Sequence, residues 1–192
     1  MIRAILFDVM GTLVHEPFYG DIPKFFGCSL EDLRVQRHPT AWIDFEKGEI
    51  DEDEYARRFF LDGRVLDKDG LKRALTTSYI WLEGMEALCQ DLVARGLPLH
   101  ALSNYSPWYA MIEEKLGLSR YLKWSFVSCD TGHRKPDSEA YLGAARALGL
   151  APEECLFIDD RPVNVDAAKK LGMPAILFED VASLRAKLTT LI

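Results

Sequence analysis

Several polar side chains that could act together on a phosphate group stand near the ends of short apolar runs in this chain of 192 residues. Asp8, Ser103 and the pair Asp159 and Asp160 each follow such a run directly, and Lys135 lies downstream of another. A carboxylate that attacks a phosphoryl group needs cations and hydrogen-bond donors, because these neutralise the charge on the phosphate oxygens. This combination of side chains therefore predicts phosphoryl-transfer chemistry.

The acidic residues could also hold a metal ion. A hard cation such as Mg2+ prefers carboxylate and carbonyl oxygens and usually binds through one or two carboxylates together with the substrate phosphate. Asp8 and Asp160 fit such a site, with Asp159 beside them. Each acid taken alone has a simpler interpretation, Asp8 as a turn or N-cap residue and the pair as acids that complement a helix dipole. Their joint occurrence favours a functional site.

The elements that must position these residues alternate along the chain. Short apolar runs predict strands at residues 4–7, 97–102, 124–127, 155–158 and 175–178. Periodic segments closed by glycine predict helices at residues 85–95, 106–116, 138–148 and 163–171, and a last helix is expected at 183–191. The alternation predicts an α/β fold, a doubly wound parallel sheet with helices on both faces. Ligands bind such sheets at the carboxyl ends of the strands.

Residues 17–77 interrupt this alternation, with aromatic and aliphatic residues at mixed spacing and no strand pattern. We expect a small all-helical insertion after the first strand. Residues 1–16 and 78–192 would then form the α/β core domain and residues 17–77 a helical domain. Within the insertion, Asp51 is expected to cap a helix, with Glu54 completing an approximate capping box.

Composition restricts the partners and the location. The chain has 23 basic and 30 acidic residues, a formal net charge of -7, which gives no electrostatic footprint for nucleic acid or an anionic membrane. The cysteines stand far apart and favour neither a zinc site nor a disulfide framework. No segment resembles a signal peptide or a membrane span. We therefore expect a cytoplasmic monomer or homodimer that acts on a small-molecule phosphorylated substrate, without nucleic-acid or membrane partners.

Four short motifs, in this order, resemble those of the haloacid dehalogenase (HAD) superfamily. They are FDVMGTL at residues 7–13, LSN at 102–104, RKPD at 134–137 and FIDDRPVN at 157–164. The resemblance covers nearly the whole chain. It implies a Rossmann-like HAD core, with the helical insertion as a small cap that closes over the site and selects the substrate.

The resemblance also implies a role for each motif residue. Asp8 would form an aspartyl-phosphate intermediate, and Lys135 would orient the nucleophile and the phosphate. The implied phosphate-binding residues are Ser103, Asn104 and Lys135, and the implied Mg2+ ligands are Asp8, the backbone carbonyl of Met10, Asp159 and Asp160. The chain would therefore be a Mg2+-dependent phosphatase that hydrolyses a small phosphate monoester.

Met10 departs from the family pattern. Phosphatases of the family usually carry a second aspartate at this position, which protonates the leaving group and activates the hydrolytic water. Such proton transfer is typically worth ~10²–10⁴-fold in rate. We therefore expect a slow enzyme, another acid, or a leaving group that needs little help. His15 and His133, near the motifs, are candidates for that acid.

Two other functions stay open. The family's dehalogenases also lack the second aspartate, because a halide leaves without a proton. They generally lack the acidic pair, however, so Asp159 and Asp160 favour phosphoryl chemistry. The chain could instead be a binding or regulatory protein that has lost turnover, although such a protein has no physical reason to keep like charges together.

Most of the aromatic residues near the motifs are expected to pack in the core, and a few of them could contact a substrate. Tyr105, Trp108 and Tyr109 follow the second motif, where an aromatic ligand could stack. These residues, the segment 16–27 and the first motif are similar to HAD proteins of plants, some of which are described as flavin mononucleotide phosphatases. The resemblance therefore implies flavin mononucleotide as a candidate substrate.

Overall fold

A parallel sheet forms the centre of the protein, whose residues 1–192 are all described by a computed structural model. Its strands are β1 (Ala4–Phe7), β2 (Leu99–Ser103), β3 (Lys123–Val127), β4 (Cys155–Asp159) and β5 (Ala175–Leu177), in the order β3-β2-β1-β4-β5. All neighbouring strands are parallel. β1 lies in the middle with every residue buried, as expected for an apolar strand that is covered on both faces.

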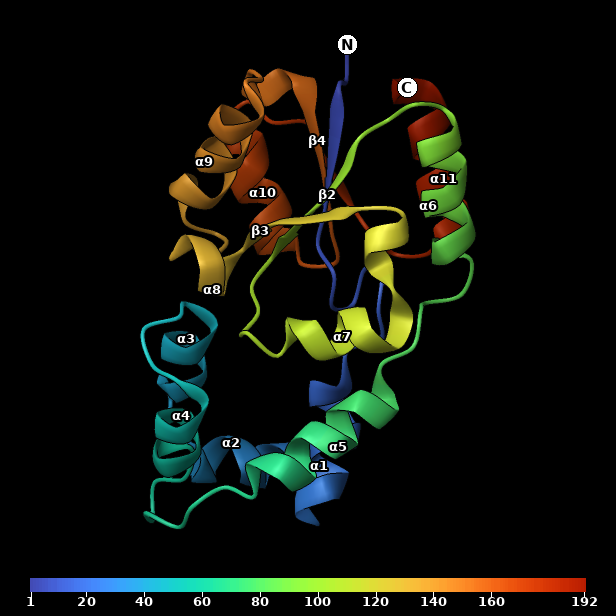
Figure 1. Cartoon of the computed structure of the whole chain (residues 1–192). Helices are drawn as coiled ribbons and strands as arrows, with labels where there is room; N and C mark the ends of the chain where they lie inside the picture. The colour runs from blue at the N-terminus through green and yellow to red at the C-terminus, as the bar shows by residue number, and fades with distance from the viewer.

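Helices cover both faces of this sheet. α6 (Met85–Ala94) and α11 (Val181–Leu191) pack together on one face, and α9 (Ser138–Leu148) and α10 (Pro162–Lys170) on the other (Figure 1). Two separate clusters of buried apolar residues lie on the two faces of the sheet, and the larger one continues into the segment between β1 and α6. The arrangement confirms the predicted doubly wound α/β fold.

Glycines end several of the helices where the sequence predicts. Gly117 and Gly149 adopt the left-handed conformation, with φ of 60° and 66°, directly after α7 (Tyr109–Leu116) and α9. The predicted start of α7 at Ser106 is wrong. Tyr109 N–H donates to the Ser106 carbonyl at 3.0 Å, so this segment is a tight turn and the helix begins after it. Three short elements lie outside the predicted ones: η2 (Leu118–Arg120), α8 (Ser128–Thr131) and η3 (Pro152–Glu154).

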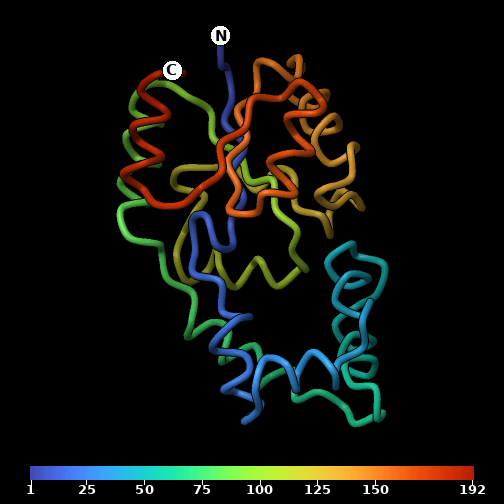
Figure 2. The backbone as a smooth tube through the Cα atoms, turned by 180° about the vertical axis from the view of Figure 1, so that it is seen from behind, coloured from blue at the N-terminus to red at the C-terminus, as the bar shows by residue number.

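Between β1 and α6 the regular elements are all helical. They are η1 (Pro17–Tyr19), α1 (Asp21–Phe26), α2 (Leu30–Gln36), α3 (Ala41–Glu46), α4 (Glu52–Arg58) and α5 (Lys68–Ser78). We call this group the helical segment. In Figure 1 and Figure 2 it lies below the sheet, at the end toward which the strands run.

The start of α4 follows the predicted cap in part. Asp51 accepts a hydrogen bond from the Glu54 N–H at 2.7 Å, as an N-cap residue does. The predicted capping box is incomplete, because the Glu54 carboxylate accepts from Arg57 at 2.8 Å instead. The ion pair along the helix surface thus replaces the reciprocal bond to the cap.

The helical segment is joined to the rest of the chain by polar contacts of α3 and α4. Glu46 of α3 accepts from Arg134 Nε at 2.7 Å, and Glu52 of α4 accepts from Trp108 Nε1 at 2.8 Å. Gly48 passes so close to α8 that a Cβ atom there would lie 2.5 Å from a backbone carbonyl oxygen. These contacts hold the helical segment over the carboxyl ends of the strands.

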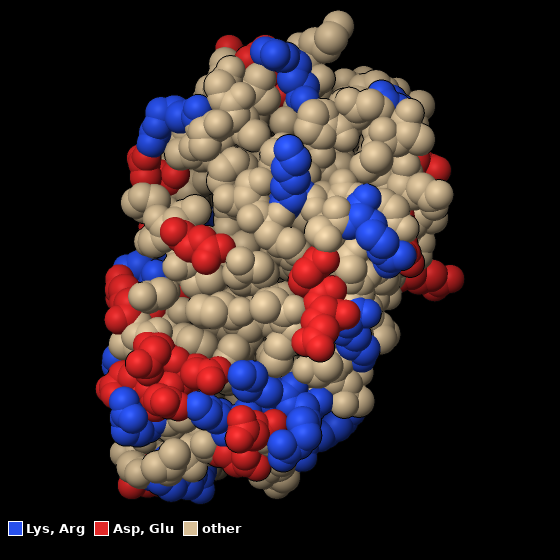
Figure 3. Space-filling model, in the orientation of Figure 1, with Lys and Arg blue, Asp and Glu red and all other residues tan.

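Acidic and basic side chains are interspersed on the helical segment, which is at the lower end in Figure 3. Several of them form ion pairs, such as Arg58 with Asp44 at 2.6 Å and Lys72 with Glu52 at 3.0 Å. Much of the charge on this segment is therefore paired within the chain. No helix in the structure is long and apolar enough to cross a membrane.

Candidate active site

The carboxyl ends of β1 and β4 bring Asp8 next to the acidic pair. The two strands pair with Phe7 opposite Ile158, and Asp8 N–H donates to the Ile158 carbonyl at 2.8 Å. Because the two parallel strands pair in register, the residues that follow this pair, Asp8 and Asp159, lie at the same edge of the sheet. Asp160 follows directly, at the start of the loop that leads to α10.

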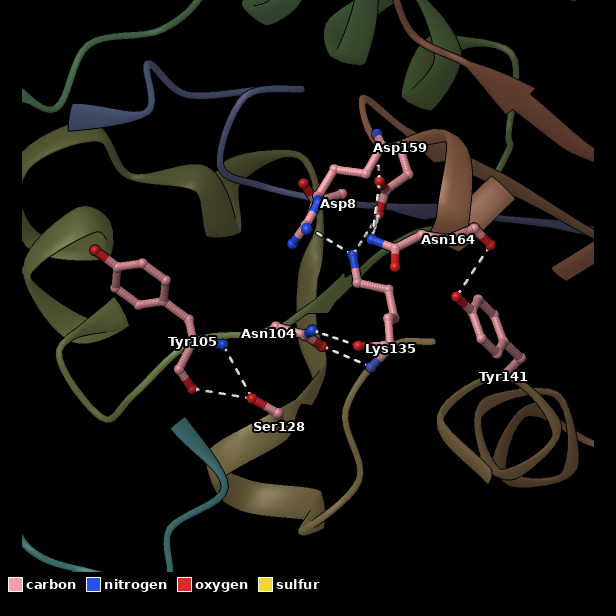
Figure 4. Close-up of polar contacts among 9 residues, drawn as sticks. Asp8, Asn104, Tyr105, Ser128, Lys135, Tyr141, Asp159 and Asn164 are labelled. Atoms are coloured by element: carbon pink, nitrogen blue, oxygen red, sulfur yellow. Dashed lines mark hydrogen bonds and ion pairs between the residues drawn. The ribbon is translucent and has the colours of Figure 1, made fainter. Parts of the chain in front are cut away.

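Lys135 lies between two of these carboxylates. Its side chain is 1% exposed, and its Nζ lies 2.7 Å from Asp8 Oδ1 and 2.7 Å from Asp159 Oδ2 (Figure 4). Asn104 holds the backbone of this lysine, because its Oδ1 accepts from the Lys135 N–H and its Nδ2 donates to the Lys135 carbonyl, both at 2.8 Å. The segments that follow β2 and β3 are thereby joined, which fixes the ammonium beside Asp8.

Asp159 accepts more hydrogen bonds than the other two acids. Besides Lys135, it accepts from the Arg161 N–H at 2.8 Å and from Asn164 Nδ2 at 3.1 and 3.0 Å. Asn164 lies in the first turns of α10, and its backbone carbonyl accepts a hydrogen bond from the Tyr141 hydroxyl at 3.0 Å. These bonds fix the orientation of the Asp159 carboxylate and, through it, the position of the lysine.

The acidic cluster has the donors that a hard cation prefers. One carboxylate oxygen from each of Asp8, Asp159 and Asp160 lies within 4.8 Å of the others. Asp160 Oδ1 is buried without a hydrogen-bond partner, and the Met10 carbonyl accepts no backbone hydrogen bond. A buried polar atom without a partner is costly unless a ligand satisfies it. The one ammonium in this cluster contacts Asp8 and Asp159 but not Asp160, so the residues present fit a divalent cation such as Mg2+.

Gly11 permits the close approach of Asp160. Its φ is 81°, in the left-handed region that favours glycine, and a Cβ atom would lie 2.6 Å from Asp160 Oδ2. A side chain at this position would therefore displace the carboxylate. The glycine of the first motif is needed for the geometry of the acidic cluster as well as for the turn.

The charge state of Asp8 depends on nearby cations. Burial raises the pKa of this carboxyl, Lys135 lowers it, and Asp159 and Asp160 raise it further. Burial likewise raises the pKa of Asp160. Only an ionised carboxylate is a good nucleophile, so positive charge at the site is what makes Asp8 reactive.

A cavity of about 370 Å³ adjoins the acidic cluster. At the end near the cluster its wall includes Met10, Glu16, Asn104 and Arg161. The rest of the wall is largely aromatic and basic, and its members include Phe18, Trp42, Tyr55, Phe59, Tyr105, Trp108, Arg34, Arg37 and Arg134. A cavity of this size, with apolar walls and a few polar groups, is typical of small-molecule binding sites.

The structure places the other predicted site residues as follows. Ser103 is buried at the end of β2, and Asn104 lines the cavity while its amide is engaged with the lysine backbone. His15 bonds to Asp21 at 2.9 Å and His133 is exposed, and neither histidine lines the cavity. The roles assigned to the site residues stay predictions.

The aromatic residues after the second motif separate into two groups. Tyr105 and Trp108 are buried and line the cavity. Tyr109 instead packs its ring against Trp124, with ring centres 4.9 Å apart. Two of the three rings are therefore placed where a ligand could meet them.

Sequence reasoning missed several residues that surround the site. Asn164 could have been found, because it belongs to the fourth motif and lies five positions after Asp159, within reach from the start of a helix. The contact of Glu46 with Arg134 joins residues that are 88 positions apart, so no local sequence pattern predicts it. Glu16, which shares the cavity wall with Met10, is likewise recognised only from the fold.

Comparison with known sequences finds related hydrolases. Residues 2–172 match the haloacid dehalogenase-like hydrolase family. The chain is 50% identical over 187 residues to flavin mononucleotide hydrolase 1 of Arabidopsis thaliana, which its name assigns to the chloroplast; the match covers 97% of this chain and 76% of that protein. It is 26% identical over 206 residues to D-ribitol-5-phosphate phosphatase of Bacteroides thetaiotaomicron, covering 100% and 99%. A cytoplasmic location and a monomeric or homodimeric state stay predictions for this chain.

Solved structures share the fold. A HAD-like family hydrolase from Porphyromonas gingivalis superposes with a TM-score of 0.77 and 26% identity, covering 100% of this chain and 98% of that one. A HAD family enzyme from Bacteroides thetaiotaomicron, crystallised with magnesium and inorganic phosphate, superposes with a TM-score of 0.73 and 21% identity, covering 96% and 99%. The sheet, its helices and the helical segment thus recur together in other proteins.

Proposed function

Because this chain belongs to the haloacid dehalogenase-like hydrolase family, we propose that it is a Mg2+-dependent phosphatase that hydrolyses flavin mononucleotide. The observation that carries the proposal is the cluster at the carboxyl ends of the strands, where the buried Lys135 contacts Asp8 and Asp159 and leaves Asp160 Oδ1 without a partner. The 50% identity to a plant flavin mononucleotide hydrolase supports this choice of substrate.

Asp8 is the proposed nucleophile. Its carboxylate attacks the phosphorus atom, the bond from phosphorus to the ester oxygen breaks, and an aspartyl-phosphate forms. Water then attacks this phosphorus, which releases inorganic phosphate and restores the carboxylate. Lys135 neutralises negative charge in both steps, since its ammonium lies within 2.7 Å of the attacking group. Asn104 and Asp159 keep the ammonium in place, and the Ser103 hydroxyl is proposed to bind a phosphate oxygen.

A magnesium ion would be held by Asp8, the Met10 carbonyl, Asp159 and Asp160. When bound, it would neutralise the phosphate oxygens and lower the pKa of Asp8, so that the nucleophile is ionised. The unpaired Asp160 oxygen and the excess of carboxylates over cations support this assignment. The relative from Bacteroides thetaiotaomicron that was crystallised with both magnesium and phosphate is consistent with it.

Residues 17–77 are proposed to act as a cap domain over a core of residues 1–16 and 78–192. The cavity is lined by side chains of both parts, among them Trp42 and Tyr55 from the helical segment and Trp108 from the core. Aromatic rings can stack on a flat conjugated ring system such as that of a flavin. The cap would therefore select the organic part of the substrate while the core holds its phosphate.

A dehalogenase is the second candidate, and Met10 is the observation that favours it, because displacement of a halide requires no proton donor. The acidic cluster favours phosphoryl chemistry instead. Attack on carbon by a carboxylate needs no cation to neutralise phosphate oxygens, and the unpaired oxygen of Asp160 would then be buried at a cost with no ligand to satisfy it.

The test measures phosphate and riboflavin release from flavin mononucleotide, with a 2-haloacid as the competing substrate. We expect equal amounts of both products, loss of turnover in Asp8→Asn, and loss after chelation that Mg2+ reverses. Asp166→Asn is the matched control, since Asp166 is an exposed residue of α10 away from the cluster, and it should keep wild-type turnover. Full activity of Asp8→Asn, or halide release without phosphatase activity, would reject the proposal.

A further inference from the structure

The leaving group in the proposed reaction needs a proton that Met10 cannot give. Flavin mononucleotide is the phosphate ester of a primary alcohol, and an alkoxide leaves poorly unless it is protonated as the bond breaks. The thioether of Met10 carries no acidic proton, yet Met10 lines the cavity where the substrate would bind. Another acid on the same wall would supply this proton, an inference that rests on the proposed function.

The loop after β1 returns Glu16 to the neighbourhood of Met10. Gly11 N–H donates to the Val14 carbonyl at 2.7 Å, and Val14 N–H donates to the Val9 carbonyl at 2.9 Å. Val14 thereby forms a bridge with Met10, and the chain re-enters the cavity two residues later. Glu16 and Met10 consequently line the same cavity, although they are not neighbours in sequence.

Glu16 also has a carboxyl oxygen available for chemistry. Its Oε1 accepts from the Phe18 N–H at 2.9 Å, which holds the side chain as the cap of η1, and no group of the chain bonds to Oε2. No basic side chain forms an ion pair with it. Glu46 is the other acid on the cavity wall, but it is committed to Arg134 at 2.7 Å. Burial raises the pKa of Glu16, which favours the protonated form that a general acid needs.

We propose that Glu16 is the proton-transfer group of this enzyme, taking the place of the aspartate that is missing at Met10. As Asp8 attacks and the ester bond breaks, the Glu16 carboxyl gives its proton to the alkoxide oxygen, so that the alcohol leaves and Glu16 becomes a carboxylate. In the second step Glu16 takes a proton from the water that attacks the aspartyl-phosphate. The phosphorus–Asp8 bond breaks, phosphate leaves, and both side chains return to their starting states.

Glu16→Gln tests this assignment with little change to the fold, because the glutamine Oε1 can accept the same bond from Phe18. The first step is measured in pre-steady-state kinetics, with substrate in excess, for flavin mononucleotide and for 4-nitrophenyl phosphate. The nitrophenolate of the second substrate departs without a proton. For flavin mononucleotide we expect a loss of ~10²–10⁴-fold. For 4-nitrophenyl phosphate we expect the nitrophenolate burst to keep its rate while later turnovers slow, since the second step still needs the base.

Two further variants complete the experiment. Glu83→Gln makes the same chemical change at an exposed residue and should behave as wild type. Met10→Asp combined with Glu16→Gln should recover flavin mononucleotide hydrolysis, because it restores a carboxyl group to the cavity wall. An equal loss of the first step for both substrates, no loss for either, or no recovery in the double variant would overturn the role of Glu16. These results leave the proposed function intact as long as wild type is active and Asp8→Asn is not.

Discussion

Replacing Lys135 by methionine removes the ammonium that Asp8 and Asp159 share while keeping the length of the side chain. The lysine is 1% exposed and lies 2.7 Å from an oxygen of each acid, so the variant leaves buried carboxylates without their cation. Removing one partner of a buried ion pair costs about 3–5 kcal/mol. In a chain of this size 1 kcal/mol corresponds to about 2–4 °C in Tm, so we expect Lys135→Met to unfold about 6–20 °C below wild type without metal.

Magnesium should reduce this difference. The variant has one positive charge fewer beside the same three acids, so a bound cation relieves more repulsion in the variant than in wild type. We expect the gap in Tm between the two proteins to narrow as Mg2+ is added to chelator-treated samples, and potassium chloride at equal ionic strength to have no such effect. The assay is thermal unfolding followed by intrinsic fluorescence.

Lys123→Met is the control for the change in net charge, because Lys123 is exposed at the start of β3. A surface substitution of this kind stays within about 0.5 kcal/mol of wild type. If Lys135→Met matched this control in Tm, or if Mg2+ left its deficit unchanged, the view that the lysine and a divalent cation balance the same carboxylates would be refuted.

Glu52 and Gly11 each make a close contact whose loss can be measured. The hydrogen bond from the Trp108 N–H and the neighbouring lysines lower the pKa of Glu52 from 4.5 to about 2. The ionised carboxylate therefore stabilises the fold above pH 4.5, and this stabilisation is lost as the pH falls toward 2. Glu52→Gln should lower Tm at pH 7 but have little effect at pH 2. Gly11→Ala should cost about 1–3 kcal/mol in backbone strain and also weaken Mg2+ binding measured by calorimetry, because the new Cβ meets Asp160. Gly27→Ala, at φ 65° with open space around it, should show the strain without the loss of Mg2+ affinity; equal affinities in the two variants would contradict the proposed clash.

The sheet could be predicted from the sequence because its signals are local. β1 is an uninterrupted apolar run that ends at a charged residue, and the helices beside it end at glycines that adopt positive φ. The start of α7 is harder to predict for an equally local reason. The turn that precedes it uses an i to i+3 hydrogen bond, and apolar periodicity does not distinguish such a turn from a helix.

The site was predictable to the extent that its residues stand at strand ends. Asp8 and Asp159 come together because two parallel strands run in register, a property that alternating strands and helices imply. The reciprocal bonds between Asn104 and the Lys135 backbone, in contrast, join segments 31 positions apart. The position of Glu16 depends on how a loop folds back on itself. Such contacts arise from tertiary packing and leave no periodic trace in the sequence.

The pairing of β1 with β4 has a consequence for how this reaction centre evolves. A slip of one residue between the two strands would move the attacking carboxylate by about 3.3 Å and turn it to the opposite face of the sheet. The alignment of Asp8 with Asp159 therefore depends on the pairing of apolar neighbours such as Phe7 and Ile158, which are buried in the sheet. Selection for catalytic turnover therefore constrains the packing of the apolar residues that fix this strand register, as well as the acidic residues themselves.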